Sequence, residues 1–530
     1  MKKLPPLLLS LLSGLLLFTA WPVSALTFLI FIAFVPLLWL EQQGIRRRKF
    51  FGWVYLSMLI WNLATTWWIW NASEPGAAGA ILANSLLMCI PWLGFHFVKA
   101  RLGDKPGYIS LMAFWMSFEY FHLSNWGLSW PWLTSGNVFA THTGWIQWYE
   151  YTGVSGGGLW ILTVNLLIFL LLRKKIKEGS FHTITLIAIA LVLAIPLAIS
   201  YLMTPNAQTT DSAAQKNIVI VQPNIDPYEK LSTGSFDAQL QKLIRLSEAA
   251  GIDSNTALVV WPETALYTEY GFEEDSLRKN YFLPPLWDFL RRHPSINLLT
   301  GIESFRLYKN KQTATAKNMT GSSTWYDSYN AATILDSSGP IAFYHKTMLV
   351  PGVETLPPFL HFLDAWFEKF GGTASGYAGQ TDRTILQTSN HSYRIAPAVC
   401  YESIYGGFMS AYIRNGADII AVITNDGWWG NTPGFRQHLN YARLRAIESR
   451  RWVVRSANTG VSCIIDPSGK ILDAQPWEKP AFIKQSVPAT NTLTFYIRNG
   501  DILSKTAVAA AIILIIWTII VIIKKKTNRA

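Results

Sequence analysis

Three polar residues at the ends of apolar, strand-like segments have the side chains that acyl chemistry requires. Glu263 closely follows the run "LVVW", Lys346 ends "IAFYHK", and Cys400 ends "RIAPAVC". A thiol at pH 7 is only a few per cent thiolate, so a nearby base or cation must activate it. Glu263 could accept the thiol proton. Lys346, helped by a backbone N–H just after Cys400, could stabilise the thiolate and then the oxyanion of a tetrahedral intermediate.

Each of these residues alone has a simpler interpretation. A cysteine at a strand end is often a small buried apolar residue, a glutamate there can cap a helix, and a lysine is usually solvated. Cys89 lies inside an apolar run and Cys463 inside a predicted strand, so we interpret both as packing residues. A disulfide between Cys400 and Cys463 is the alternative in an oxidising compartment.

Strands and helices that could position the trio alternate between residues 205 and 502. Helices are expected near 234–250 and 435–450, with turns at "DSSG" and "DPSG". Several strand segments are apolar throughout, as in strands covered on both faces. The predicted strands are 217–222, 257–261, 297–302, 331–336, 341–346, 393–400, 418–424, 452–457 and 462–466. This pattern predicts a layered α/β domain, in which strand ends converge at one edge.

The rest of the chain has the composition of a membrane protein. Half of the residues are hydrophobic and 24 are tryptophan. Apolar runs of roughly spanning length predict about eight membrane helices. They cover residues 4–20, 25–40, 51–70, 78–98, 107–123, 158–172, 182–203 and 506–523. The expected domains are a transmembrane domain of seven spans (1–204), a catalytic domain (205–502), and a last helix with a basic tail (503–530).

Basic residues indicate how these helices are oriented. Lys and Arg cluster at the N-terminus, at 46–49, at 99–105, at 173–177 and at 524–529, whereas the loops 71–77 and 124–157 contain none. Because basic loops stay in the cytoplasm, we expect both termini there and residues 205–502 outside the inner membrane. These clusters account for the net charge of +12, so no nucleic-acid footprint remains. A cleaved signal peptide ending at "PVSA" is an alternative for the first span.

The ordered motifs "WPET", "YHK" and "CYES" resemble the Glu–Lys–Cys signature of the nitrilase superfamily. Together with the spans, they resemble the apolipoprotein N-acyltransferase family over essentially the whole chain. The resemblance implies an αββα sandwich, with Cys400 as nucleophile, Glu263 as general base and Lys346 on the oxyanion side. It also assigns supporting or substrate-binding positions. These are Glu354 beside the lysine, Tyr401 and Glu402 after the nucleophile, and Tyr228 where the family has an aromatic residue.

The resemblance implies a two-step transfer without a cofactor. Cys400 takes an acyl chain from a phospholipid, typically phosphatidylethanolamine, and passes it to the α-amino group of a diacylglyceryl-cysteine at a lipoprotein N-terminus. Residues 350–370 form an aromatic, proline-interrupted stretch beside the site. We expect its lipid-facing residues to be Phe359, Phe362, Trp366 and Phe367, although packing on the domain is equally consistent. Trp428 and Trp429 could rim an acyl groove or anchor at the interface.

Other functions fit the sequence less well. The histidines lack the spacing of metal ligands, so no metal site is expected. A membrane-tethered amidase acting on a small molecule would need one anchor rather than eight spans. A transporter with a sensor domain would be expected to show internal repeats and polar residues within its spans, but Glu119 is the one plausible embedded acid.

Overall fold

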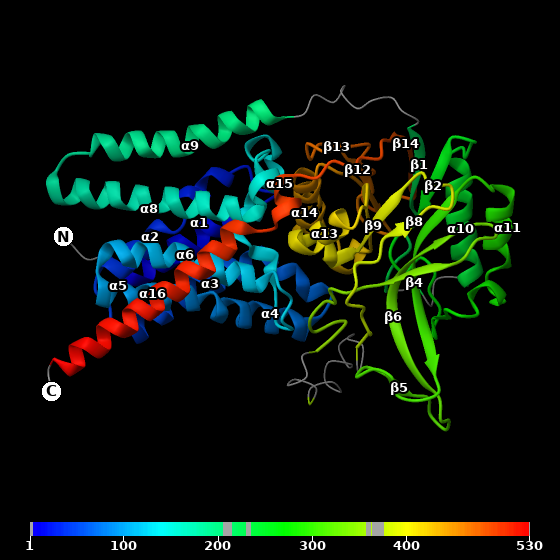
Figure 1. Ribbon diagram of the computed structural model, residues 1–530, viewed down its shortest axis with the longest axis horizontal. Helices are drawn as coiled ribbons and strands as arrows, with labels where there is room; N and C mark the ends of the chain where they lie inside the picture. Colours follow the sequence, from blue (N-terminus) through cyan, green and yellow to red (C-terminus); the bar gives the residue numbers. More distant parts are fainter. Residues whose placement is uncertain are drawn as a thin grey trace. The chain divides into compact units, whose positions relative to one another are not determined.

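The computed structural model describes residues 4–204, 215–228, 230, 235–356, 362 and 376–528. The chain divides into two compact units (Figure 1). The first unit comprises residues 1–67, 77–204 and 499–530. The second comprises residues 68–76 and 205–498. The short segment Trp68–Gly76, which follows a helix of the first unit, therefore groups with the second unit.

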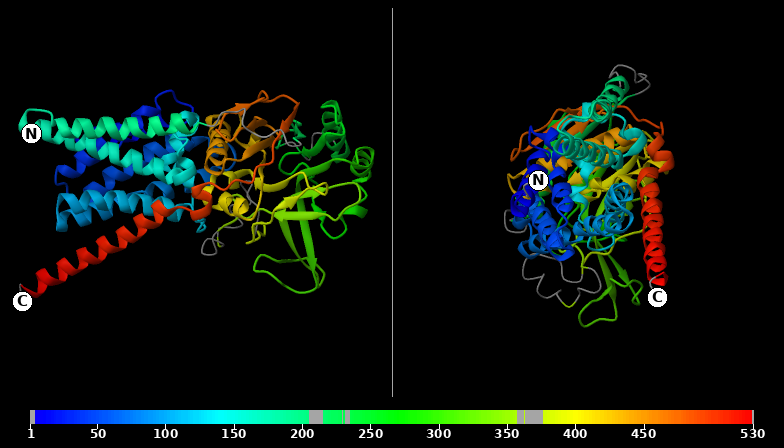
Figure 2. Two further views of the ribbon diagram at one scale, coloured as in Figure 1. Left: turned by 45° about the horizontal axis from the view of Figure 1, so that its top comes forward. Right: turned by 90° about the vertical axis from the view of Figure 1, so that its left-hand side faces the viewer.

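The first unit consists of apolar helices. In Figures 1 and 2 its helices α8 and α9 run side by side. Its α-helices are α1 (Pro6–Ala20), α2 (Val35–Gln42), α3 (Arg47–Thr66), α4 (Glu74–Leu87), α5 (Cys89–Leu102), α6 (Asp104–His122), α7 (Tyr149–Thr152), α8 (Val154–Glu178), α9 (Thr183–Met203) and α16 (Ile502–Thr527). Each predicted span thus falls on helical chain.

Four stretches in the described part of the chain are both long and apolar enough to cross a membrane. They are residues 74–102, 154–178, 183–203 and 502–527. The first joins α4 and α5 around Met88. The leucine-rich α1 and the stretch Thr27–Gln42 are apolar but shorter. The helical character predicted for this region is confirmed, whereas the count of eight spans stays a prediction.

Two β-sheets form the centre of the second unit. The first sheet has the strand order β14-β1-β2-β4-β6-β5, with β3 beside β4 and β7 beside β6; the second has the order β13-β12-β11-β10-β9-β8. The strands of the first sheet are β1 (Lys216–Gln222), β2 (Thr256–Val260), β3 (Phe272–Glu273), β4 (Asn297–Tyr308), β5 (Lys317–Asn318), β6 (Trp325–Leu335), β7 (Ala342–His345) and β14 (Ala481–Val487). Those of the second are β8 (Leu386–Gln387), β9 (Arg394–Val399), β10 (Ile419–Thr424), β11 (Trp452–Ala457), β12 (Cys463–Ile465) and β13 (Ile471–Leu472).

Helices cover the outer faces of both sheets. The helices α10 (Phe236–Ala249) and α11 (Pro284–Arg292) pack on the first sheet, on one side of the strands in Figure 1. The helices α13 (Gly406–Arg414) and α14 (Pro433–Ser449) pack on the second sheet, and α15 (Phe495–Asn499) follows near the end of the unit. The inner strands β1 and β11 face each other. The predicted αββα layering is confirmed.

The apolar pattern explains why α10 lies where it does. Ser235 caps the helix by accepting a hydrogen bond from the Ala238 N–H. Leu240, Leu243 and Ile244 follow at helical spacing and are buried against the first sheet. Burying a side chain of this size contributes about 1.5–3 kcal/mol. The strands β2, in the first sheet, and β10, in the second, are fully buried. The predicted catalytic residues meet between these two sheets.

Candidate active site

The candidate active site lies where strands from both sheets end. Glu263 follows β2 and Lys346 follows β7, both in the first sheet, whereas Cys400 follows β9 in the second sheet. All three side chains are buried. The packing of one sheet on the other therefore brings together residues that are far apart along the chain.

Lys346 is at the centre of this cluster. Its Nζ lies 2.8 Å from Glu354 Oε1 and 3.4 Å from Glu263 Oε1, and only 1% of the side chain is exposed. Burial alone would lower the pKa of the ammonium, but Glu354 and Glu263 outweigh it and raise the pKa above its usual range. An unpaired buried ammonium would cost several kcal/mol, so these two carboxylates keep Lys346 charged inside the protein.

Asn330, on β6, links the two carboxylates. Its side-chain amide donates one hydrogen bond to Glu263 Oε1 and one to Glu354 Oε1, each at 2.9 Å. Both amide protons are used in this way. On the other side, the Asn425 backbone N–H donates to Glu263 Oε2 at 3.1 Å. Glu263 is thus held by donors from both sheets.

Cys400 adopts an unusual backbone conformation. Its φ of 54° lies in the left-handed region, which non-glycine residues rarely adopt. Burial raises the pKa of the thiol, and the charge of Glu263 raises it further, while Lys346 and a hydrogen bond with Thr424 lower it. The pKa stays above its usual range. The thiol is therefore protonated at neutral pH and needs a base in order to react.

Glu402 connects the chain around Lys346 with the chain around Cys400. Its Oε1 accepts hydrogen bonds from the Tyr344 hydroxyl at 2.5 Å and from the Thr347 and Met348 N–H groups at 2.7 and 3.1 Å. Its Oε2 accepts from the Val399 N–H at 2.8 Å. Burial raises the pKa of Glu402 to about 7, although these donors oppose the shift. Glu402 fixes the spacing between two strand ends.

The remaining predicted site residues occupy two kinds of position. Tyr401 is buried and its ring meets the edge of Tyr405. Tyr228 and Trp428 are instead exposed, and their rings contact each other edge-on at 5.1 Å. The Tyr228 hydroxyl lies 2.8 Å from both the Asn71 and the Trp428 carbonyl oxygens. No interaction given by the structure for the described residues joins Tyr228 to the Glu–Lys–Cys trio.

The aromatic segment expected beside the site is largely outside the described residues. Phe359, Trp366 and Phe367 fall among those that the structure does not describe. Phe362 is described, and 79% of it is exposed.

Two other predictions about the cysteines and metals can be compared with the structure. All three cysteines are free thiols, so the alternative disulfide between Cys400 and Cys463 is wrong. Within the described ranges, no group of His, Cys, Asp or Glu has the arrangement of a metal site.

Sequence reasoning missed two residues that hold Glu263. Asn330 lies one position before the predicted strand 331–336. The available signal was an amide side chain directly beside an apolar run. Asn425 follows the predicted strand 418–424, within "TNDGWWG", where polar residues directly after a buried strand were again the signal.

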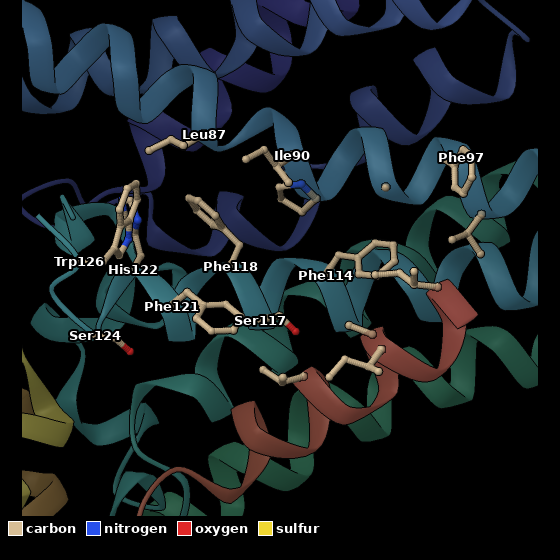
Figure 3. Close-up of a pocket in the computed structure, with 17 residues that line it drawn as sticks. Leu87, Ile90, Phe97, Phe114, Ser117, Phe118, Phe121, His122, Ser124 and Trp126 are labelled. Carbon is tan, nitrogen blue, oxygen red and sulfur yellow. The ribbon is translucent and has the colours of Figure 1, made fainter. Parts of the chain in front are cut away.

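The first unit also contains an apolar recess, of about 740 Å³. It lies between α5, α6 and α16, and Figure 3 shows Phe114, Phe118 and Ile90 among its lining side chains. Most of its lining residues are apolar, with Ser117, His122 and Ser124 among the exceptions. Such a surface suits hydrocarbon rather than bond-breaking chemistry.

The αββα layers and the buried Glu–Lys–Cys trio are those expected of a carbon-nitrogen hydrolase domain. Residues 217–490 match the family model for carbon-nitrogen hydrolases. Yeast Nit3, a member of branch 10 of the nitrilase superfamily, aligns with a TM-score of 0.36 and 17% identity over 56% of this chain and 98% of its own.

The helical part narrows this class to one family. Residues 13–167 match the model of the apolipoprotein N-acyltransferase N-terminal domain. An apolipoprotein N-acyltransferase of Chlorobaculum tepidum is 32% identical over 94% of this chain and 93% of its own, and one of Azotobacter vinelandii is 28% identical over 93% and 91%. The chain belongs to the apolipoprotein N-acyltransferase family, and it is an acyltransferase.

Proposed function

We propose that this enzyme transfers a fatty acyl chain from a phospholipid, through a thioester on Cys400, to the α-amino group of the S-diacylglyceryl-cysteine that begins an apolipoprotein. The observation that carries this proposal is the buried cluster in which Lys346 contacts both Glu263 and Glu354 and lowers the pKa of a thiol that burial and Glu263 raise. The amidase alternative is not favoured, because the match to the acyltransferase extends through the helical part.

In the first step, Glu263 takes the thiol proton while the sulfur attacks the ester carbonyl of the phospholipid. Because burial disfavours a free thiolate, proton transfer and attack are expected to occur together. The charge that develops on the carbonyl oxygen faces Lys346 and the Tyr401 N–H. The C–O bond then breaks, the leaving lysophospholipid oxygen takes the proton from Glu263, and a thioester remains.

In the second step, the lipoprotein α-amine attacks the thioester carbonyl. Glu263 accepts a proton from the attacking nitrogen, the C–S bond breaks, and the departing sulfur takes that proton back. The product is an amide, and Cys400 is again a thiol. Glu354 balances the charge of Lys346 throughout, so that Glu263 can change its protonation state without leaving a buried ammonium unpaired.

The supporting residues have separate proposed roles. Glu402 positions the ends of β7 and β9 through its four hydrogen bonds. Tyr401 supplies its backbone N–H, and its side chain is buried against Tyr405. Tyr228 and Trp428 form an exposed aromatic pair, which we propose contacts lipid.

We further propose that phosphatidylethanolamine is the donor and that the chain lies in the bacterial inner membrane with both termini cytoplasmic. The catalytic domain, residues 205–502, would then lie on the periplasmic side, between a transmembrane domain (1–204) and a last helix with its basic tail (503–530). Lys524, Lys525 and Lys526 at the end of α16 support a cytoplasmic C-terminus.

Incubation of the purified enzyme with phospholipid alone tests the function. Mass spectrometry should detect a fatty-acyl adduct on Cys400, which adding a diacylated lipopeptide should discharge. Phosphatidylethanolamine and phosphatidylglycerol are compared as donors. Cys400→Ala should form no adduct, and Glu263→Gln and Lys346→Ala should form it at least about a hundredfold more slowly. Absence of an adduct in the unaltered enzyme would refute the proposal, as would full activity of Cys400→Ala.

A further inference from the structure

A fully buried polar network lies behind the nucleophile and has no part in the proposed reaction. His438 comes from α14, Asp426 from the short helix η9 (Asp426–Trp429), and Arg455 from β11. Asp426 Oδ1 lies 3.0 Å from His438 Nδ1, and Arg455 Nη2 donates to Asp426 Oδ2 at 2.7 Å. All three side chains have no exposed surface. Charged groups are buried this completely only when they are paired and hydrogen-bonded, as these are.

The opposite side of the imidazole faces the nucleophile's own backbone. His438 Nε2 lies 3.1 Å from the Cys400 carbonyl oxygen and 3.0 Å from the Ser403 hydroxyl oxygen. The Ser403 hydroxyl donates to the same carbonyl at 2.9 Å. A carbonyl oxygen can only accept hydrogen bonds, so Nε2 carries a proton and donates toward it. The Cys400 carbonyl therefore has two donors, from His438 and Ser403.

Asp426 and Arg455 fix the ring in this orientation. Burial by itself raises the pKa of the Asp426 carboxyl, but Arg455 and His438 outweigh it and hold the pKa below its usual range. The ionised carboxylate therefore lies against Nδ1, and Arg455 Nη2 lies 3.2 Å from the same nitrogen. Thr424, which interacts with the Cys400 thiol, also donates to Asp426 Oδ1 at 3.0 Å.

These contacts explain how Cys400 keeps its left-handed backbone. A non-glycine residue rarely adopts this region, and the conformation persists only when its surroundings hold it there. In a trans peptide the carbonyl and the following N–H point in opposite directions. Fixing the Cys400 carbonyl therefore also fixes the direction of the Tyr401 N–H and the exit of the sulfur.

We propose that His438 is a positioning residue for the reaction: its Nε2–H, oriented by Asp426 and Arg455, fixes the Cys400–Tyr401 peptide so that the sulfur and the Tyr401 N–H meet the acyl carbonyl together. This inference rests on the proposed role of Cys400. His438 itself transfers no proton in the reaction.

Two amide substitutions of His438 separate this role from a general requirement for a polar side chain. The amide nitrogen of Gln is as many bonds from Cα as Nε2 of His, so His438→Gln keeps the donor to the Cys400 carbonyl. Asn reaches only the position of Nδ1, so His438→Asn keeps the contact with Asp426 and loses that donor. The measurement is single-turnover acylation of Cys400 by phospholipid, with KM and the maximal rate determined separately.

We expect His438→Gln to acylate within about fivefold of the unaltered enzyme. His438→Asn should lose roughly a hundredfold in maximal rate with little change in KM, because a misplacement of about 1 Å has that effect. Equal rates in the two variants would overturn the proposal, as would a loss in His438→Gln as large as in His438→Asn. If His438→Asn does not fold, Ser403→Ala removes the second donor to the same carbonyl and should lower the maximal rate in the same way; an unchanged rate would overturn the proposal.

Alkylation of Cys400 by iodoacetamide provides a readout that is independent of lipid. The alkylation rate should change at least about threefold in His438→Asn and stay near the unaltered value in His438→Gln, since only the former releases the peptide. If the unaltered enzyme formed no acyl adduct, the proposed function would fail while this comparison still tested the positioning role. Identical alkylation rates in all three proteins would overturn it.

Discussion

At the scale of single residues, the surroundings of Cys400 disfavour its thiolate although a lysine lies nearby. Burial and the charge of Glu263 raise the pKa of the Cys400 thiol, whereas Lys346 and the hydrogen bond with Thr424 lower it. Lys346 is itself held by Glu354 and Glu263, so its charge is already balanced by two carboxylates. The nucleophile therefore stays protonated until a substrate is present, which protects a reactive thiol from oxidation and alkylation.

This balance predicts the pH dependence of Cys400 alkylation. An exposed thiol has a pKa of about 8.5, so its alkylation rate levels off near pH 9–9.5. Because burial raises the pKa of Cys400, its rate should still be rising between pH 9 and 10.5. Iodoacetamide labelling followed by mass spectrometry measures this. The exposed position Lys309, changed to Cys, serves as the internal reference. A plateau for Cys400 at the same pH as for Lys309→Cys would contradict the prediction.

At the scale of elements, β4 carries Gly301 where the neighbouring chain leaves β2. A Cβ atom at Gly301 would lie 2.4–2.6 Å from backbone atoms of Pro262, Glu263 and Thr264. The Gly301 N–H donates to the Pro262 carbonyl at 3.1 Å, and Thr264 is in the left-handed region with φ 46°. Glycine is needed here because the turn that presents Glu263 lies directly on β4.

Gly301→Ala should therefore displace Glu263 and lower activity. We expect a loss of about 1–3 kcal/mol in stability from overpacking and roughly a hundredfold loss in the rate of acyl transfer. Initial rates and thermal unfolding of the variant measure both effects. Gly407→Ala is the matched control, because Gly407 is exposed in α13 and a Cβ there meets no atom within 4 Å. Equal rates in the two variants would show that the Glu263 turn tolerates the displacement.

The same elements show what sequence can and cannot predict. Apolar runs ending in Glu263, Lys346 and Cys400 identified the strands, because burial on both faces leaves a continuous apolar pattern. The pairing of strands into two sheets depends on contacts between distant segments, which leave no local pattern. For that reason Asn330, which bridges Glu263 and Glu354, was not predicted. Nor did any local signal reveal that His438 on α14 lies against the Cys400 carbonyl.

At the scale of the whole molecule, the segment Trp68–Gly76 belongs to the second unit although it joins α3 to α4. Trp68 packs against Trp429 with ring centres 4.8 Å apart, and Asn71 Nδ2 donates to the Trp429 carbonyl at 2.9 Å. Tyr228 completes the attachment through its hydroxyl. These contacts hold the segment within the second unit, next to the residues that follow β10.

Tyr228→Phe should loosen this attachment. Removing one hydroxyl that serves two carbonyl oxygens is expected to cost about 1 kcal/mol. Amide hydrogen exchange of residues 68–76, followed by mass spectrometry, should accelerate about fivefold. Tyr281→Phe is the control, because Tyr281 is also highly exposed and its ring contact is with the adjacent Phe282. The same exchange rate in both variants would mean that the Tyr228 hydroxyl does not hold the segment.

The proposed topology makes a separate prediction. Lys309→Cys, in the catalytic domain, should react with a membrane-impermeant maleimide in intact spheroplasts, whereas Lys525→Cys, in the last turn of α16, should react only after the membrane is opened. Both positions are exposed, and the three native cysteines are buried, so background labelling should be low. Labelling of Lys525→Cys in intact spheroplasts would place the C-terminus outside.

The division of the trio between two sheets has a consequence for biogenesis. Glu263 and Lys346 precede Cys400 in the chain, and the sulfur acquires its partners only once the two sheets pack on each other; the first sheet is itself completed by β14, near the end of the domain. A polypeptide that is still being synthesised would accordingly carry an ordinary, unassisted thiol. Acyl transfer would begin only with the finished protein, so stalled or truncated chains would not consume membrane lipid.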